Sequence, residues 1–394
     1  MPTELAIKEL TQNEDVQSTS MEEAWEAEKN ALDTVDKLNH QHIVRRIAAI
    51  KRGDIRYFLF PLADGGNLHE FWATELRPEL TTDRMKEVIL QLRGIDDAIH
   101  QFHSPPNKIR HGDIKPENIL VFNKNMGWLD TLKIADLGLA KHHAVATELR
   151  PHGTSTRYRT IAYEAPEAVT SPSKALTRLY DIWSLGCVAI ELLIWLLYGY
   201  LELKRFKIRV EGNMDNFGPT RNASYFEQGE DGPHVHPTVI VWMDHMSKDP
   251  ECKGDTSMKD LLHIVRHQLL VVNLPSSFHE EDTTHNDIGS PLIRFPEPEA
   301  SSIRPTRAGG RALVKSLDDI IAKADKRKGY LYSGKTRDNL RGPADIAPDH
   351  GEGLAPPGST QRRRDKLPIR GMPMVSPPLP LGSSQIVGKN MKIS

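Results

Sequence analysis

The chain has 394 residues, of which 38% are hydrophobic, enough to fill the core of one large globular domain or two ordinary ones. Its 51 basic and 53 acidic side chains give a formal net charge of -2, so no global field favours a nucleic acid or an anionic membrane as a partner. The two cysteines, Cys187 and Cys252, have neither disulfide nor metal spacing, and the N-terminus lacks a signal-peptide pattern, which together predict a reducing, cytoplasmic location.

The N-terminal part of the chain is predicted to contain three strands and one helix. Residues 5–8, Leu-Ala-Ile-Lys, form a short strand, and residues 21–38 carry apolar side chains at helical spacing. Two further strands are predicted at 44–50 and 55–61, before the turn-rich residues 63–68. We therefore expect a small sheet with one helix, in which the strand at 5–8 is an unpaired edge.

An amphipathic helix is predicted over residues 82–103, because its apolar side chains fall three or four positions apart and Thr82 or Asp83 can cap it. It leads directly into the most informative stretch of the chain, His-Gly-Asp-Ile-Lys-Pro-Glu-Asn at residues 111–118.

That stretch is a short polar loop in front of the apolar run at 119–122. A carboxylate at Asp113, an ammonium group at Lys115 and a carboxamide at Asn118 suit phosphoryl transfer from a metal-bound nucleotide to a hydroxyl group. Asp113 would orient the hydroxyl, Lys115 would neutralise charge on the phosphate, and Asn118 would hold a metal ion. The alternative interpretation is an ordinary polar loop before a core strand.

A second polar group is predicted to lie beside this loop. Strands at 119–122 and 131–135, joined by turn residues, would form a hairpin whose open ends bring Asn118 and Asp136 together. Amide and carboxylate oxygens are the ligands that Mg²⁺ requires when it bridges phosphates. The sequence therefore predicts a magnesium site at Asn118 and Asp136.

Several motifs in a fixed order make the sequence resemble the eukaryotic protein kinases. The stretch at 111–118 is similar to their catalytic loop and Asp136-Leu137-Gly138 to their metal-binding D-F-G. The tripeptide at 165–167, Ala-Pro-Glu, is similar to the A-P-E that closes their activation segment. The spacing of Asp181, Trp183 and Gly186 matches the start of their large C-lobe helix.

The resemblance covers about residues 5–325 and implies an α+β, bilobal fold. It implies a small, incomplete, β-rich N-lobe at 1–62 and a large, mostly helical C-lobe at 63–325, with an insert at about 204–300. The implied activity is a serine/threonine protein kinase that uses ATP and Mg²⁺ and acts on protein substrates.

The resemblance also implies which residues bind ATP. Ala6-Ile7-Lys8 is similar to the kinase strand V-A-I-K, so Lys8 would hold the phosphates and Glu28 would pair with it, a solvated helix charge being the alternative for Glu28. Phe60 would gate the adenine pocket, backbone groups at 62–63 would face adenine, and Asn67 would lie near the ribose. The predicted ATP-binding residues are Ala6, Lys8, Glu28, Phe60, Leu62, Ala63, Asn67 and Leu120.

The predicted catalytic residues are Asp113, Lys115 and Thr160. Thr160, three residues before Tyr163, is similar to the threonine that bridges base and lysine in kinases acting on Ser or Thr. Gly112 stands where these kinases usually have an arginine, which would pair with a phosphorylated activation segment. Activation by phosphorylation of that segment is therefore not the expected mechanism.

A nearly all-apolar segment at 182–201 is long enough to imitate a membrane span, but its internal Glu191 and Gly186 favour a buried central helix. After it we expect a polar insert to about residue 237, and then helices at 238–247 and 256–272.

Near the end of the C-lobe, Arg304-Pro305-Thr306 resembles the R-P-T that precedes the last kinase helices, which implies an ion pair between Arg304 and Glu167. A final helix is predicted through Leu313, Leu317 and Ile320.

From residue 341 to 394 the chain is rich in Pro, Gly and Ser, a composition that predicts a disordered tail. Within it, the three arginines at residues 362–364 resemble a nuclear localisation signal. Residues 377–380 resemble a polyproline ligand for a partner protein. A solvated tail is the simpler interpretation of both.

Only seven residues precede Lys8, so the sequence given contains no Gly-rich phosphate loop before it. Two hypotheses follow: an ATP-dependent Ser/Thr kinase, impaired in this chain by the missing loop, or a pseudokinase scaffold that binds protein partners without catalysis. The complete set of Asp113, Lys115, Asn118 and Asp136 favours the kinase, because a scaffold has no chemical need for all of them.

Overall fold

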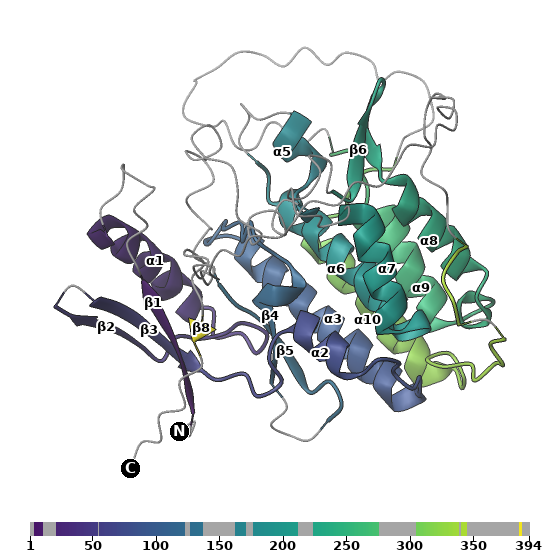
Figure 1. Cartoon of the computed structure of the whole chain (residues 1–394), viewed down its shortest axis with the longest axis horizontal. Coiled ribbons are helices and arrows are strands. Elements are labelled where there is room, and N and C mark those ends of the chain that lie inside the picture. Colours follow the sequence, from purple (N-terminus) through teal and green to yellow (C-terminus); the bar gives the residue numbers. More distant parts are fainter. Residues whose placement is uncertain are drawn as a thin grey trace, which may run out of the picture.

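In the computed structural model the chain forms two lobes, a small sheet with one helix and a larger, mostly helical part (Figure 1). The predicted α+β, bilobal, kinase-like architecture is thereby confirmed. The structure describes residues 4–10, 21–53, 55–122, 127–136, 162–170, 176–211, 224–275, 305–338, 340–344 and 386–387.

The N-lobe is a four-stranded sheet in the order β2-β3-β1-β8. Strand β1 (Leu5–Leu10) pairs antiparallel with β3 (Ile55–Pro61), and β3 pairs in turn with β2 (Ala48–Arg52). Helix α1 (Met21–Asp36) packs on this sheet, where the rings of Trp25 and Phe58 stack with their centroids 4.4 Å apart. Because Phe58 is opposite Lys8 in the register, this contact holds α1 over the strand that carries Lys8.

The fourth strand, β8 (Ile386–Val387), comes from the far end of the chain. Its backbone pairs antiparallel with β1, Val387 opposite Ile7 and Ile386 opposite Lys8 (Figure 1). The prediction that the strand of Lys8 is an unpaired edge was therefore wrong. The rest of the predicted tail, apart from residues 341–344, lies outside the described residues.

The C-lobe begins after the crossover at residues 62–67. Asn67 caps α2 through a capping box with Glu70: the Asn67 side chain accepts a bond from the Glu70 backbone N–H, and the Glu70 carboxylate accepts one from the Asn67 N–H. The helices of this lobe that the structure describes are α2 (Leu68–Thr74), α3 (Thr82–His103), α5 (Pro166–Thr170), α6 (Leu179–Tyr198), α7 (Tyr200–Glu211), α8 (Pro237–Ser247), α9 (Ser257–Ile264) and α10 (Gly310–Lys326).

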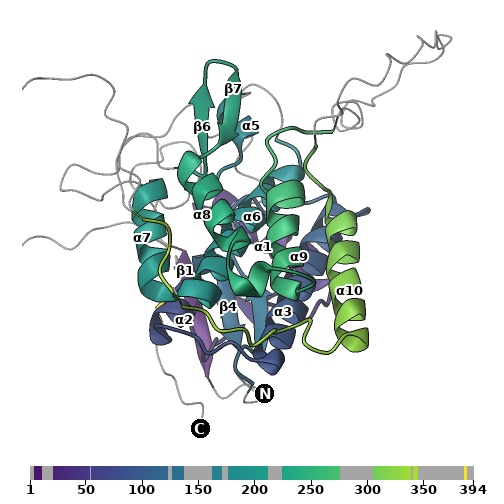
Figure 2. The same ribbon diagram turned by 90° about the vertical axis from the view of Figure 1, so that its right-hand side faces the viewer.

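Short elements connect these helices. The segment η1 (Pro116–Asn118) leads into a hairpin of β4 (Ile119–Phe122) and β5 (Thr131–Ile134), as the sequence predicted. A second hairpin, β6 (Phe226–Gly229) and β7 (Gly232–Val235), precedes α8 and projects beyond the helices (Figure 2). Two further turns are η3 (Pro250–Cys252) and η4 (Val265–Leu269).

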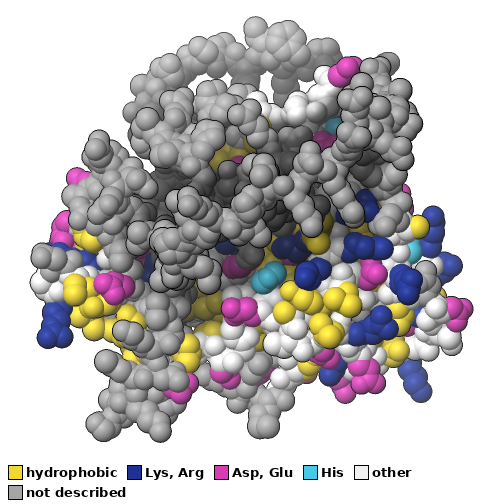
Figure 3. Space-filling model, in the orientation of Figure 1, with side chains coloured by type: hydrophobic (Ala, Val, Ile, Leu, Met, Phe, Trp, Pro, Cys, Tyr) yellow, Lys and Arg dark blue, Asp and Glu magenta, His cyan; other side chains and the backbone are white. Residues whose placement is uncertain are grey.

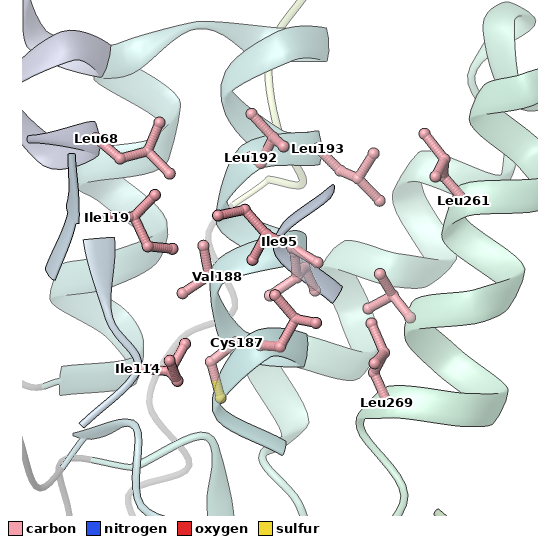
Figure 4. Close-up of a cluster of buried hydrophobic side chains, with 14 of the residues drawn as sticks. Leu68, Ile95, Ile114, Ile119, Cys187, Val188, Leu192, Leu193, Leu261 and Leu269 are labelled. Atoms are coloured by element: carbon pink, nitrogen blue, oxygen red, sulfur yellow. The ribbon is translucent and has the colours of Figure 1, made fainter. Parts of the chain in front are cut away.

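Helix α6 is the centre of the C-lobe core. By length and composition it could span a membrane, yet all of its residues are buried in the fold. Its Cys187, Val188 and Leu192 lie among side chains from α3, α9 and the loop before β4 (Figure 4). A helix that is apolar all round and fully buried is typical of a soluble core, which agrees with the predicted central helix.

Several boundaries differ from those predicted. Helix α7 occupies residues 200–211, where a polar insert was expected, because its apolar positions Leu203, Phe206 and Val210 are buried at helical spacing. The predicted helix at 256–272 changes at Val265 into the π-helical turn η4. Strand β2 begins at Ala48 rather than at residue 44.

The residues ahead of β2 instead join the two lobes. The Val44 N–H donates to the Ile134 carbonyl at 2.9 Å, and the Ile134 N–H donates to the His42 carbonyl at 2.9 Å. Ile43 and Ile134 form a parallel bridge. This contact ties the N-lobe to β5, the strand that ends beside Asp136.

Arg304, the predicted partner of Glu167, lies outside the described residues, and the ion pair of Glu167 that the structure describes is with Arg307. Arg307 donates from Nη1 to Glu167 Oε1 at 2.7 Å and from Nη2 to Oε2 at 3.0 Å. Its Nε and Nη1 also bond to the carbonyls of Val271 and Leu179. Arg307, the second arginine of Arg-Pro-Thr-Arg, is buried, with 1% of its surface exposed.

Charge is mixed on the visible face of the C-lobe. Lys and Arg side chains alternate with Asp and Glu side chains over the described surface, in agreement with a formal net charge of -2 (Figure 3).

Candidate active site

Lys8 lies at the centre of a buried ion-pair cluster between the lobes. Strand β1 directs its side chain inward, where Nζ is 2.7 Å from Glu28 Oε1 on α1 and 2.9 Å from Asp136 Oδ1. Burial alone would lower the pKa of Lys8, but Asp136 and Glu28 outweigh it and raise this pKa above its ordinary value. Lys8 therefore carries a fixed positive charge, and Glu28 is the partner that the sequence predicted.

Asp136 follows strand β5 in an uncommon backbone conformation. Its φ is 62°, a left-handed value that residues other than glycine rarely adopt. Register places Ile119 opposite Ile134, and the Ala135 N–H donates to the Asn118 carbonyl at 2.9 Å. The hairpin thus brings Asn118 and Asp136 to the same end, as predicted, and 36% of the Asp136 side chain stays exposed.

Asp113 is the centre of a second cluster, on the loop before η1. Lys115 Nζ donates to both of its carboxylate oxygens, at 3.0 and 2.8 Å, and Asn118 Nδ2 donates to Oδ2 at 2.7 Å. Burial raises the pKa of Asp113 above its ordinary value, although Lys115 acts in the opposite direction. The Asp113 carboxyl group is thus buried, with an ammonium group and an amide held against it.

The loop that carries Asp113 is hydrogen-bonded to Asp181 on α6. The backbone N–H groups of His111 and Gly112 each donate to the Asp181 carboxylate at 2.8 Å, and His103 Nε2 lies 2.8 Å from it. Burial would raise the pKa of Asp181, but His103 and His111 outweigh it and hold this pKa below its ordinary value. A charged Asp181 therefore fixes the turn at Gly112, whose φ of 80° suits glycine.

His111 connects the two clusters. Its ring lies between the loop and β5, with Nε2 3.1 Å from the Ala135 carbonyl and Nδ1 accepting the Asp113 N–H at 3.2 Å. Since Ala135 precedes Asp136, the same imidazole sets the positions of Asp113 and Asp136. Sequence reasoning assigns no role to His103, His111 or Asp181, although His103 precedes the loop and Asp181 opens the motif at 181–186.

A cavity of about 290 Å³ opens beside Lys8, between β1, the crossover and the end of β5. All of the predicted ATP-binding residues line it, and so does Asp136. Residues that sequence reasoning missed also line it: Leu32, Val44, Pro61, Gly66, Glu70, Glu117 and Ala135. Most of these are sequence neighbours of predicted residues, so adjacency was the available signal.

Some polar groups of the crossover beside this cavity already form hydrogen bonds within the protein. The Leu62 N–H donates to the Glu4 carbonyl at 3.4 Å, a long bond, and the Ala63 carbonyl accepts the Gly66 N–H at 3.2 Å. The Asn67 side-chain oxygen is used in capping α2. Leu120 lies opposite Asn67 in an antiparallel bridge, which brings the hairpin against the crossover.

The two oxygen ligands predicted for a metal fit a hard cation that also binds phosphates. Asn118 donates its amide hydrogens to Asp113, so its side-chain oxygen is available as an acceptor, and the hairpin brings Asp136 to the same end. The described residues contain no group of three His, Cys, Asp or Glu side chains that could hold a metal by themselves. Two protein oxygens with phosphates and water as the other ligands is the usual arrangement for Mg²⁺.

One predicted catalytic residue, Thr160, lies outside the described residues. Tyr163, three residues further on, is bonded to residues of the C-lobe. The Tyr163 hydroxyl donates to Glu191 Oε1 at 2.7 Å and accepts a bond from Lys207 Nζ at 2.7 Å. Tyr225 also donates to Glu191. Lys207 lies on α7, in the region where a polar insert was expected.

The amino-acid sequence matches the protein kinase domain family over residues 2–211, just over half of the chain. The chain belongs to the protein kinase family. The matched part of this kinase includes β1, the crossover, both clusters around Lys8 and Asp113, and helices α6 and α7.

Individual relatives are also kinases by name. The chain is 30% identical over 169 residues to a putative mitogen-activated protein kinase kinase kinase 7-like protein of Drosophila melanogaster, covering 43% of this chain and 39% of that protein. It is 31% identical over 193 residues to the serine/threonine-protein kinase cds1 of Schizosaccharomyces pombe, covering 48% of this chain and 38% of that protein. The matches thus span about two fifths of the length of these relatives.

Proposed function

We propose that this kinase transfers the γ-phosphoryl group of ATP to serine or threonine hydroxyls of proteins. The observation that supports this best is the juxtaposition of two clusters: Lys8 with Glu28 and Asp136 at one end of the cavity, and Asp113 with Lys115 and Asn118 beside it. One cluster can hold a nucleotide phosphate and the other can hold a hydroxyl, which is the positioning that phosphoryl transfer requires.

The cavity offers different surfaces to the parts of ATP. Ala6, Val44 and Leu120 give it apolar walls for an adenine ring. Because the Leu62 N–H already bonds to Glu4, we expect the Ala63 N–H to be the better donor to the ring. Lys8 would bind the phosphates, and Glu28 keeps its ammonium group in place.

In the transfer, the substrate hydroxyl oxygen bonds to the γ-phosphorus while the bond from that phosphorus to the β–γ bridging oxygen breaks, so ADP leaves. The hydroxyl proton passes to the Asp113 carboxylate, which burial and two donors hold in one orientation. The Lys115 ammonium group, 2.8 Å from Asp113, then lies where it can neutralise charge on the moving phosphate. Mg²⁺ bound at Asn118 and Asp136 would supply charge neutralisation between the phosphates.

Two features favour serine and threonine over tyrosine as acceptors. Lys115 follows Asp113 by two positions, as in the kinases of that class that the catalytic loop resembles. Relatives with similar sequences are named serine/threonine-protein kinases, among them cds1 and chk-2, the latter 32% identical over 162 residues.

The test is phosphate transfer from labelled ATP to peptide libraries in which the single hydroxyl is Ser, Thr or Tyr. We expect incorporation on Ser and Thr, and Asp113→Asn should reduce kcat by about a thousandfold or more. Asp325→Asn, an exposed carboxylate on α10, is the matched control and should keep full activity. Nucleotide binding without transfer to any library would support a pseudokinase scaffold instead.

A further inference from the structure

Strand β1 has neighbours of very different origin on its two edges. On one edge β3 pairs with it along all six residues of β1, from Leu5 opposite Pro61 to Leu10 opposite Arg56. On the other edge the structure describes a pairing with β8, which involves Ile7 and Lys8. The pairing with β8 therefore includes Lys8, whose side chain forms the buried ion pairs.

We propose that the C-terminal segment around Ile386–Val387 serves as an intramolecular edge strand that covers β1 and steadies Lys8. The pairing uses backbone N–H and C=O groups, which an open edge strand presents unpaired. Addition of a short extended segment to such an edge is a general mode of recognition between chain segments. The occupant proposed is this chain's own tail.

The amino-acid sequence of the tail singles out this segment. Ile386 and Val387 are adjacent β-branched residues, which favour strands, between Gly382-Ser383-Ser384 and Gly388. The preceding stretch 373–380 contains four prolines, which lack the N–H that pairing requires.

The tail is long enough to return to the N-lobe. Ala344 is the last described C-lobe residue before β8, and 42 positions separate it from Ile386. A coiled chain of that length spans roughly 35 Å and an extended one well over 100 Å. A tether of this kind gives the segment an effective concentration near the millimolar range, so weak pairing suffices.

The position of β8 has a consequence for the nucleotide site. Lys8 is opposite Ile386, so backbone pairing there restricts β1 at the residue whose ammonium group lies between Glu28 and Asp136. Pairing and occupation of the cavity by a nucleotide should then favour each other, because both order the same residue.

Hydrogen exchange followed by mass spectrometry on the segment Leu5–Leu10 of the full chain tests the proposal. The double variant Ile386→Pro with Val387→Pro removes both N–H groups of β8, and exchange of the β1 segment should become at least tenfold faster for the amides that face β8. The matched control, Ile369→Pro with Val375→Pro, makes the same changes elsewhere in the tail and should leave exchange as in the parent. Equal exchange in all three chains, or equal acceleration in both variants, would overturn the proposal.

A crosslink separates the chain's own tail from a second copy. Residues opposite each other in antiparallel strands have Cβ atoms about 5 Å apart, so Ile7→Cys with Val387→Cys should oxidise to a disulfide within one chain and migrate as a monomer. Ile7→Cys with Ile369→Cys should not. A disulfide-linked dimer, or equal crosslinking in the two pairs, would contradict pairing within the chain.

Discussion

At the scale of single residues, the site depends on buried ion pairs and hydrogen bonds between its polar side chains. Lys8 contacts both Glu28 and Asp136, and Asp113 contacts both Lys115 and Asn118. Removing one member leaves a buried group without its partner, which costs more than the bond itself. The two aspartates have different partners, so their losses should have different effects.

Asp113→Asn and Asp136→Asn should separate catalysis from nucleotide binding. The first should lower kcat and keep Mg-ATP affinity, whereas the second should weaken Mg-ATP affinity as well, because it removes a predicted metal ligand and a partner of Lys8. Calorimetric titration with Mg-ATP checks this. Equal affinity in the parent chain and in Asp136→Asn would refute the role assigned to Asp136.

The raised pKa of Asp113 predicts the acid side of the pH–rate profile. Transfer needs the carboxylate, so activity should fall as pH falls through this pKa, with a midpoint above the ordinary aspartate value of about 4. The profile of kcat against pH, measured with Mg-ATP saturating, gives the midpoint. An acid limb at or below the ordinary value would show that Lys115 outweighs burial.

At the scale of elements, the C-lobe is held by buried polar contacts between segments distant in sequence. Arg307, ahead of α10, reaches Glu167 at the start of α5, and its guanidinium group is fully buried. Asp96 in α3 is also fully buried, but neither of its oxygens has a hydrogen-bond partner among the described residues. These two groups should act on stability in opposite directions.

Arg307→Ala should destabilise the fold by about 3 kcal/mol, because Glu167 would remain as an uncompensated carboxylate. Arg307→Lys should recover only part of that loss, since lysine cannot form the two parallel bonds. Thermal melts of the variants measure the effect. A melting temperature of Arg307→Ala equal to that of the parent would mean that the ion pair does not contribute.

Asp96→Leu should stabilise the fold. Burial raises the pKa of Asp96 well above its ordinary value, so the folded state binds this proton more tightly than the unfolded state does. Stability of the parent therefore falls as pH rises above about 4, and the gain from Asp96→Leu should grow over the same range. The apolar cavity beside Asp96, lined by Leu92 and Leu193, gives the new side chain room. Melting curves at acidic and neutral pH that show no gain at either would contradict this prediction.

The sequence predicted those parts of the site that lie on continuous motifs. The predicted hairpin was enough to bring Asn118 and Asp136 together, and Asp113 stands at a fixed spacing before it. Lys8 was assigned only because Ala6-Ile7-Lys8 resembles the kinase strand V-A-I-K. Arg307 was missed because Arg-Pro-Thr-Arg offers two arginines, and the sequence alone does not distinguish which of them can reach Glu167. Strand β8 was missed because a pairing between the two ends of the chain leaves no local pattern.

At the scale of the whole molecule, both lobes contribute residues to the proposed active site. β1 and α1 provide Lys8 and Glu28, the β4–β5 hairpin provides Asp136, and the loop anchored on α6 provides Asp113. Backbone bonds from residues 42–44 to Ile134 fix the N-lobe to that hairpin. We propose that the region so assembled transfers the γ-phosphoryl group of ATP.

The most direct test is the rate of γ-phosphate transfer to a Ser/Thr substrate by the parent chain, Lys8→Met and Lys37→Met. Lys37 is an exposed lysine just after α1, so its variant should match the parent. Lys8→Met should lose about a hundredfold or more in kcat/KM, because the phosphates lose their fixed cation. Equal transfer by Lys8→Met and the parent, or no transfer by the parent with Mg-ATP bound, would contradict the claim.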